Sequence, residues 1–230
     1  MDYGTAFSYV FQDKDWIKKI LIGAVITLVP IVNFALLGYT IEIMRRVARG
    51  ETEVLPDWGQ FGELFKKGLL GFVVGLVYLL PVILIVACSA VANIGLVAVA
   101  SGADSDTAGL LVTASTVLQA CFYCLAFILA IAGGLLQIPA LGVLGDTGQL
   151  GPALRIGEVA KLLRSSPGPF IIAILILGVV SSILAPIGVL ACVVGVFVVS
   201  AYISAVGGHL YGQAYREAKG KSGMMMQPAM

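Results

Sequence analysis

Long apolar blocks alternate with short polar intervals along this 230-residue chain. Every charged side chain except Glu42 lies outside the blocks, which cover residues 20–44, 69–100, 110–144 and 170–212. A helix crosses the hydrocarbon core of a bilayer with about 20 apolar residues. The pattern predicts an all-α, polytopic membrane protein that forms a single integral membrane domain over residues 1–230. We expect four to five spans and three interfacial amphipathic helices.

The last apolar block is too long for one crossing. The sequence Ala185-Pro186-Ile187-Gly188 supplies a turn signal in its middle, so two spans are expected there. The predicted order is an interfacial helix at 5–19, a re-entrant or kinked span at 20–44, a cytoplasmic loop with an interfacial helix at 45–68, a span at 69–100, an external turn at 101–109, a span at 110–144, a cytoplasmic interfacial helix at 145–169, spans at 170–185 and 188–212, and a cytoplasmic tail at 213–230.

The first block contains Pro30 and Asn33 near its middle. Proline removes a backbone donor and clashes with the preceding turn, and Asn33 is suited to cap a new helix that starts at Phe34. The block is therefore either one Pro-kinked span with an external N-terminus or a re-entrant hairpin of two half-helices. Basic residues on both flanks favour the hairpin, because such residues stay on the cytoplasmic side. Helix breaks are also expected at Pro81 and Pro186.

Amphipathic segments and basic residues mark the expected membrane boundaries. The predicted interfacial helices carry an apolar face opposite charged side chains. Tryptophan and basic side chains gather at such boundaries. The expected anchors are Trp16, Lys18, Lys19, Arg45, Arg46, Trp58, Lys66, Lys67 and Arg164.

The distribution of Lys and Arg predicts the orientation of the chain. Residues 101–109 contain two aspartates and no Lys or Arg, whereas the intervals around 45–67 and 145–167 and the tail are basic. These basic parts are expected to be cytoplasmic. In the first of these intervals, Gly50 is expected to cap a helix end. Glu42, just before this interval, is expected to pair with Arg45 or Arg46 one turn on.

Composition supports the membrane assignment and excludes other classes. Hydrophobic residues make up 59% of the chain, charged residues 12%, and the mean hydropathy is +1.01. A soluble domain carries about 25% charged residues. A net charge of +1 argues against a nucleic-acid partner. The expected partners are the lipid bilayer and other membrane proteins, reached through Gly/Ala/Ser-rich helix faces such as Gly71-x-x-x-Gly75.

Several segments together resemble a known family: DKDWIKKILIG (13–23), PIVNF (30–34), GYTIEIMRRVARGE (38–51), LPDW (55–58) and IGEVAKLLRSSPGPF (156–170). They are similar to an uncharacterised family of prokaryotic multi-pass membrane proteins, the domain of unknown function 4013. The resemblance covers nearly the whole chain. It implies an integral membrane protein of a bacterium or archaeon, and it implies no activity or site residues. The expected location is the prokaryotic cytoplasmic membrane, with the C-terminus cytoplasmic because the tail is basic.

Few residues are candidates for chemistry. His209 is the only histidine and a weak candidate for binding a haem or chlorophyll metal, with Gly207 and Gly208 leaving room for a flat ring. The competing interpretation is an interfacial histidine bonded to the protein or water. Cys121 and Cys124 have redox-motif spacing but lie inside an apolar block without partners, where packing explains them. We expect no catalytic residues, no metal and no cofactor.

Two functional classes remain. The first is a non-enzymatic scaffold, assembly or bilayer-organising protein. The second is a small transporter or channel that uses broken helices around Pro30 and Asn33. A cavity lined by Asn33, Gln119 and Gln137 would favour the transporter. A pigment- or haem-associated subunit using His209 is a further alternative.

Overall fold

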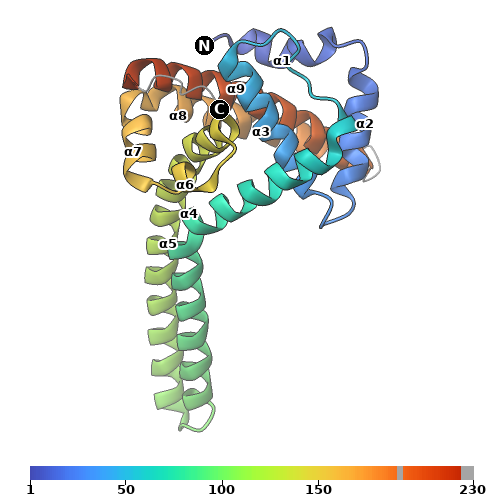
Figure 1. The fold of residues 1–230 in the computed structure, drawn as a ribbon. Helices are drawn as coiled ribbons and strands as arrows, with labels where there is room; N and C mark the ends of the chain where they lie inside the picture. Colours follow the sequence, from blue (N-terminus) through green and yellow to red (C-terminus); the bar gives the residue numbers. More distant parts are fainter. Residues whose placement is uncertain (191–193, 224–230) are drawn as a thin grey trace. The chain divides into compact units, whose positions relative to one another are not determined.

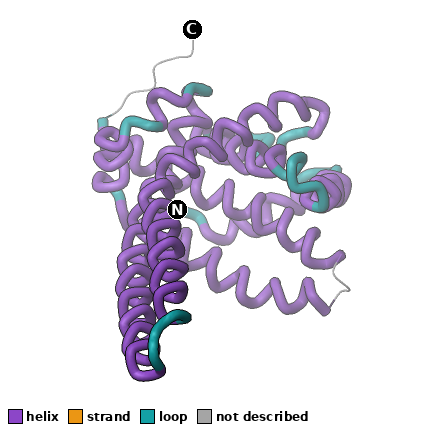
Figure 2. Tube along the Cα trace, turned by 90° about the horizontal axis from the view of Figure 1, so that it is seen from below, coloured by secondary structure: helices purple, strands orange, loops and turns teal. Residues whose placement is uncertain are grey.

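The computed structural model describes residues 1–190 and 194–223, and all secondary structure within them is helical (Figures 1 and 2). The elements are α1 (Tyr3–Gln12), α2 (Trp16–Thr27), α3 (Phe34–Arg49), η1 (Trp58–Gln60), α4 (Phe61–Ala100), α5 (Ser105–Thr147), α6 (Leu150–Ala153), α7 (Ile156–Ser165), α8 (Pro167–Leu190) and α9 (Val194–Ser222). Within the described residues, four helical segments are long and apolar enough to cross a membrane: Trp58–Ala100, Ser105–Thr147, Pro167–Leu190 and Val194–Ser222. The predicted all-α, polytopic fold is confirmed.

The chain divides into two compact units. The hairpin unit is Leu76–Gly134, and the core unit combines Met1–Gly75 with Leu135–Met230. Both boundaries fall inside the long helices α4 and α5, so each of these helices belongs partly to each unit.

The hairpin unit consists of the second part of α4, a short turn and the first part of α5. Small or polar side chains close the space between its two helices. Ser89, Ser115 and Ala126 are buried, and the Gln119 amide donates to the Ser89 hydroxyl at 3.4 Å. Large apolar side chains cover the rest of its surface.

Helices α3 and α9 are central to the core unit. Helix α9 packs against α1, α2, α3, α7 and α8. Glycines permit the contact between α9 and α3. A Cβ atom at Gly208 would lie 2.9 Å from the Thr40 carbonyl oxygen, and one at Gly212 would lie 2.9 Å from the Met44 carbonyl oxygen. The two backbones therefore approach closely along two turns.

A second close approach joins α3 to the first turns of α4. A Cβ at Gly38 would overlap the Leu64 carbonyl oxygen, and a Cβ at Gly68 would overlap the Phe34 carbonyl oxygen. Helix α3 ends at Arg49 and is capped by Gly50, whose φ of 73° is accessible to glycine at low cost, as expected for this cap. Packing on several sides buries most of α3, including Tyr39 and Glu42.

The structure corrects two predicted helix breaks. Helix α4 continues through Pro81 and α8 continues through Pro186 to Leu190, so spans at 170–185 and 188–212 are wrong in their boundaries. A proline removes only one backbone donor, and long apolar helices accommodate this loss by local adjustment. Residues 191–193, which include Cys192, stand between α8 and α9 in the sequence and lie outside the described residues.

The first apolar block is interrupted as the proline pattern suggested. Helix α2 ends at Thr27 and α3 begins at Phe34, while Asn33 makes no side-chain cap bond. The predicted interfacial helix at 5–19 is instead divided between α1 and α2, because residues 13–15 form a separate turn. Its Asp13 side chain accepts the Asp15 N–H at 2.8 Å.

Candidate functional site

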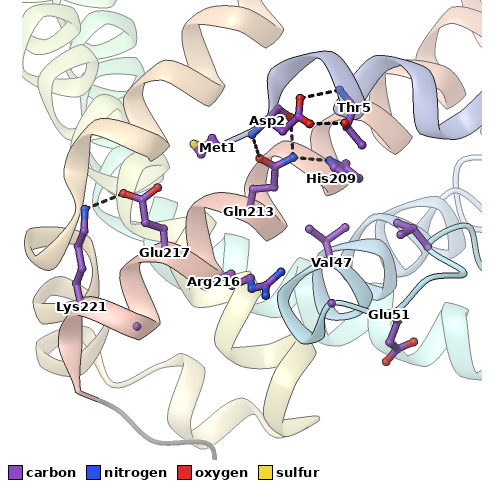
Figure 3. A pocket seen from close by; sticks show the side chains of 13 residues that line it. Met1, Asp2, Thr5, Val47, Glu51, His209, Gln213, Arg216, Glu217 and Lys221 are labelled. Atoms are coloured by element: carbon purple, nitrogen blue, oxygen red, sulfur yellow. Dashed lines mark hydrogen bonds and ion pairs between the residues drawn. The ribbon is translucent and has the colours of Figure 1, made fainter.

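Two neighbouring cavities in the core unit share Thr5, Val54 and His209 in their walls. The first has a volume of about 710 Å³ and is bordered by α1, the end of α3 and the C-terminal part of α9 (Figure 3). The second has a volume of about 630 Å³ and lies between α1, the start of α2 and residues 52–57. His209 therefore lies in the wall that the two cavities of the core unit share.

Hydrogen bonds determine the protonation pattern of His209. The backbone N–H of Asp2 donates to Gln213 Oε1 at 2.7 Å, which orients the amide of Gln213. The Gln213 Nε2 group then donates to the Asp2 carbonyl oxygen at 2.8 Å and faces His209 Nδ1 at 3.0 Å (Figure 3). Because an amide N–H₂ only donates, His209 Nδ1 must accept. The ring is thus neutral, with its proton on Nε2.

The surroundings of His209 are protein rather than open space. The residue is only 6% exposed, and its ring stacks on Tyr9 with 4.5 Å between centroids. The room expected beside Gly207 and Gly208 is filled. A Cβ at Gly207 would lie 3.4 Å from Leu177, and Gly208 lies against α3. The idea that these glycines make space for a flat ring is therefore wrong.

Lys19 joins three segments around the second cavity. Its ammonium donates to Asp13 at 2.7 Å and to the Leu55 carbonyl oxygen at 3.2 Å, and it lies 3.6 Å from Asp57. Burial raises the pKa of Asp13, but the hydrogen bonds from Lys19 and from the Asp15 N–H, together with the charge of Lys19, outweigh it and hold this pKa below its usual value. The carbonyl oxygen of Lys19 also accepts the Trp58 indole N–H at 2.9 Å. These bonds tie residues 52–58 to α2.

Glu42 is the centre of a buried ion-pair cluster. Its carboxylate accepts from Arg45, from Arg46 Nε at 3.1 Å and from Lys67 Nζ at 2.6 Å, although Glu42 is only 4% exposed. Burial raises the pKa of Glu42, but hydrogen bonds from Arg45 and Lys67 outweigh it and lower the pKa to about 2. The expected pairing with Arg45 and Arg46 is confirmed. The contribution of Lys67, from α4, was not predicted.

A second carboxylate links α3 to the end of α9. Asp146 pairs with Lys219, lies 3.6 Å from Arg49 and accepts from the Tyr215 hydroxyl at 3.4 Å. Sequence reasoning missed Asp146, because its partners are more than 65 residues away along the chain. It also missed Gln213, although the spacing of four residues from His209 on one helix could have suggested that contact.

A family model described as a protein of unknown function, DUF4013, matches residues 21–206. The chain belongs to the DUF4013 family. No curated protein and no solved structure matches it. The match covers α3, most of α2 and the first part of α9, and it ends three residues before His209. The Glu42 cluster therefore belongs to the DUF4013 region, whereas Lys19, His209 and Gln213 lie outside it.

The predicted anchors of this DUF4013 chain fall into two groups. Four of them form ion pairs inside the protein: Lys19, Arg45, Arg46 and Lys67. Three others, exposed and without an ion pair among the described residues, are Lys18, Lys66 and Arg164. Trp16 packs edge-on against Phe11, and Trp58 stacks on Tyr39 with 4.6 Å between centroids. Both tryptophans thus serve packing within the core unit.

The residues proposed for a transport path are not gathered in one place. Asn33 lies exposed in the turn before α3, Gln119 bonds Ser89 inside the hairpin unit, and Gln137 lies beside Gly75 in the core unit. None of the three lines either cavity around His209. The cavities offer hydrogen-bonding groups, but His209 has an amide rather than a carboxylate on Nδ1. That arrangement lacks the orienting acid of a nucleophile–histidine–acid triad.

Proposed function

We propose that this protein is a non-enzymatic, membrane-embedded organising protein of the prokaryotic cytoplasmic membrane. It acts through contacts with lipid and with other membrane helices. The observation that carries the proposal is the hairpin unit, whose outward surface is apolar along both helices while its inner face is closed by small residues. Such a surface is suited to packing in a bilayer and offers no polar route through it.

The dimensions of the hairpin unit support this role. The α4 portion, residues 76–100, is about 38 Å long and the α5 portion, residues 105–134, about 45 Å, at about 1.5 Å per residue. Both exceed the ~30 Å of a hydrocarbon core. Exposed side chains along them include Leu84, Ile94 and Phe127. The hairpin therefore crosses and returns, with the turn at 101–104 outside.

Charge distribution supports the orientation. With α4, α5, α8 and α9 as the four crossings, all 14 Lys and Arg residues lie on the same side as the C-terminal tail. Basic residues in short loops stay on the cytoplasmic side. The C-terminus is accordingly cytoplasmic. A fifth crossing by residues 20–44 would place Lys14, Lys18 and Lys19 outside, which the same tendency disfavours.

Site-specific photocrosslinking in the native membrane tests the proposal. A benzoylphenylalanine at Phe127, which is exposed, is expected to form adducts with lipid or with discrete membrane proteins. The matched aromatic control at Tyr78, which is buried in the same hairpin, is expected to give internal crosslinks only. Purified protein in liposomes should show no flux of ions or small solutes. Saturable flux, or no adduct at Phe127, would overturn the proposal.

A further inference from the structure

One face of α2 is left uncovered by the rest of the described residues. Four apolar side chains spaced three or four residues apart, and 50% to 63% exposed, form this face: Ile17, Leu21, Val25 and Leu28. The opposite face packs on the core unit, where a Cβ at Gly23 would lie 3.2 Å from Ala201 of α9. Because α9 is a candidate span, α2 lies against a helix at membrane depth. We call the exposed face the α2 stripe.

The turn that follows α2 extends the apolar surface. Val29 and Ile31 are exposed, with Ile31 at 69%, and no charged residue occurs between Ile20 and Ile41. A turn of this kind would be costly in water as an exposed apolar tip and costly in lipid if its backbone were unpaired. Whether the turn is less costly in lipid than in water therefore depends on how many of its backbone groups are hydrogen-bonded.

Most backbone groups of the turn are paired within the chain. The N–H groups of Leu28, Val29 and Asn33 donate to carbonyl oxygens three or four residues earlier, and Pro30 has no N–H. The carbonyl oxygens of Val29, Ile31, Val32 and Asn33 accept bonds from residues further along. This turn pairs most of its backbone polar groups within the chain, which lipid tolerates better than an open loop.

We propose that the α2 stripe and the 28–33 turn insert into the acyl chains of one leaflet from the cytoplasmic side, without crossing. The proposal rests on the proposed orientation of the chain. Helix α2 has 12 residues and is about 18 Å long, against a leaflet of ~15 Å. Exposed Lys14 and Lys18 at its start lie at the level of anionic headgroups. The tip thus reaches the middle of the bilayer.

Helix α3, which follows the 28–33 turn, is protected from lipid by protein. Helix α3 packs against α9 through Gly208 and against α4 through Gly38 and Gly68. The buried Glu42 carboxylate, in the middle of α3, is paired with three basic side chains. The pair of helices α2 and α3 therefore exposes α2 to lipid and buries α3 in protein. Insertion of α2 and the 28–33 turn adds volume to one leaflet only. A wedge confined to one leaflet adds a second lipid-contacting element to the hairpin unit on which the proposed function rests.

Spin-label depth measurements test the insertion. Single cysteines at Lys18, Val25 and Ile31, in a background with the four native cysteines replaced, are labelled with nitroxide in phosphatidylethanolamine–phosphatidylglycerol vesicles. Collisions with oxygen should increase, and collisions with a water-soluble nickel complex should fall, in the order Lys18, Val25, Ile31. Thr52, in the exposed loop after α3, is the aqueous control. Leu84, on the hairpin unit, is the lipid-facing control.

Each outcome separates this inference from the proposed function. If Ile31 is reached by the nickel complex as readily as Thr52, the tip lies in water and the insertion is wrong. If Ile31 is immobilised and reached by neither reagent, protein covers the stripe and the insertion is also wrong. In both cases Leu84 still reports the hairpin unit in lipid. A water-exposed Leu84 would instead overturn the proposed function itself.

Discussion

Replacing Glu42 by glutamine removes the one negative charge that three basic side chains share. The carboxylate is buried, and its pKa is lowered from 4.5 to about 2. That difference corresponds to about 3 kcal/mol of stabilisation at neutral pH. Arg45, Arg46 and Lys67 are each between a fifth and a third exposed, so solvent screening reduces the expected loss to about 2–3 kcal/mol. Glu42 lies outside the four candidate spans, so an aqueous reference state applies.

Thermal unfolding in mild detergent, followed by tryptophan fluorescence, measures this loss. At about 2–4 °C per kcal/mol, Glu42→Gln should lower Tm by roughly 5–10 °C at pH 7. Trp58 is a suitable reporter because it stacks on Tyr39 of α3. The matched control is Glu63→Gln, an exposed acid on α4, for which a change within about 0.5 kcal/mol is expected. Equal Tm values for the two variants would refute the role of the cluster.

The pH dependence supplies an independent check. Because the folded pKa of Glu42 is depressed, its stabilisation is complete above 4.5 and is lost as the pH falls towards 2. The Tm difference between wild type and Glu42→Gln should therefore stay constant from pH 8 to pH 5 and shrink below about pH 4.5. A difference that instead grew on acidification would have the wrong sign for this account.

Other substitutions test packing and buried polarity. Gly38→Ala should lower the free energy of unfolding by at least about 3 kcal/mol, because the new Cβ meets a backbone carbonyl group. It should also reduce the monodisperse fraction in size-exclusion chromatography. The control Gly62→Ala, whose Cβ would point into open space, should do neither. Tyr39→Phe should raise the free energy of unfolding by about 1 kcal/mol, since this buried hydroxyl has no hydrogen-bond partner among the described residues. Tyr9→Phe should lower it by about 1 kcal/mol, because Tyr9 donates to the Ala205 carbonyl oxygen at 2.8 Å. Thermal unfolding that placed the two tyrosine variants in the reverse order would contradict this assignment.

Local periodicity was sufficient to predict contacts within one helix. Glu42 pairs with Arg45 and Arg46 because residues three and four apart share a helix face. Lys67 could not be assigned in this way, since it reaches Glu42 only where α3 crosses α4 at Gly38 and Gly68. Such a crossing depends on tertiary packing that no local pattern records.

Sequence alone also could not separate lipid-facing residues from protein-facing ones. Lys19 was expected at the membrane boundary, yet it is buried between Asp13 and the Leu55 carbonyl oxygen. Pro186 was expected to end a span, but a single missing donor leaves α8 intact. Composition predicted the class of protein, because apolar surface area must be covered by lipid whatever the detailed packing.

The sidedness of Ser8 tests the central claim, a four-crossing chain with its basic residues on one side. Ser8 is exposed on α1, and Ser105 begins α5 after the turn of the hairpin unit. Single cysteines at these positions, in the background without native cysteines, are treated with a membrane-impermeant maleimide in intact cells. The account predicts labelling of Ser105→Cys at once and of Ser8→Cys only after permeabilisation. Labelling of Ser8→Cys in intact cells would mean that the first apolar block crosses the bilayer, and it would contradict the account.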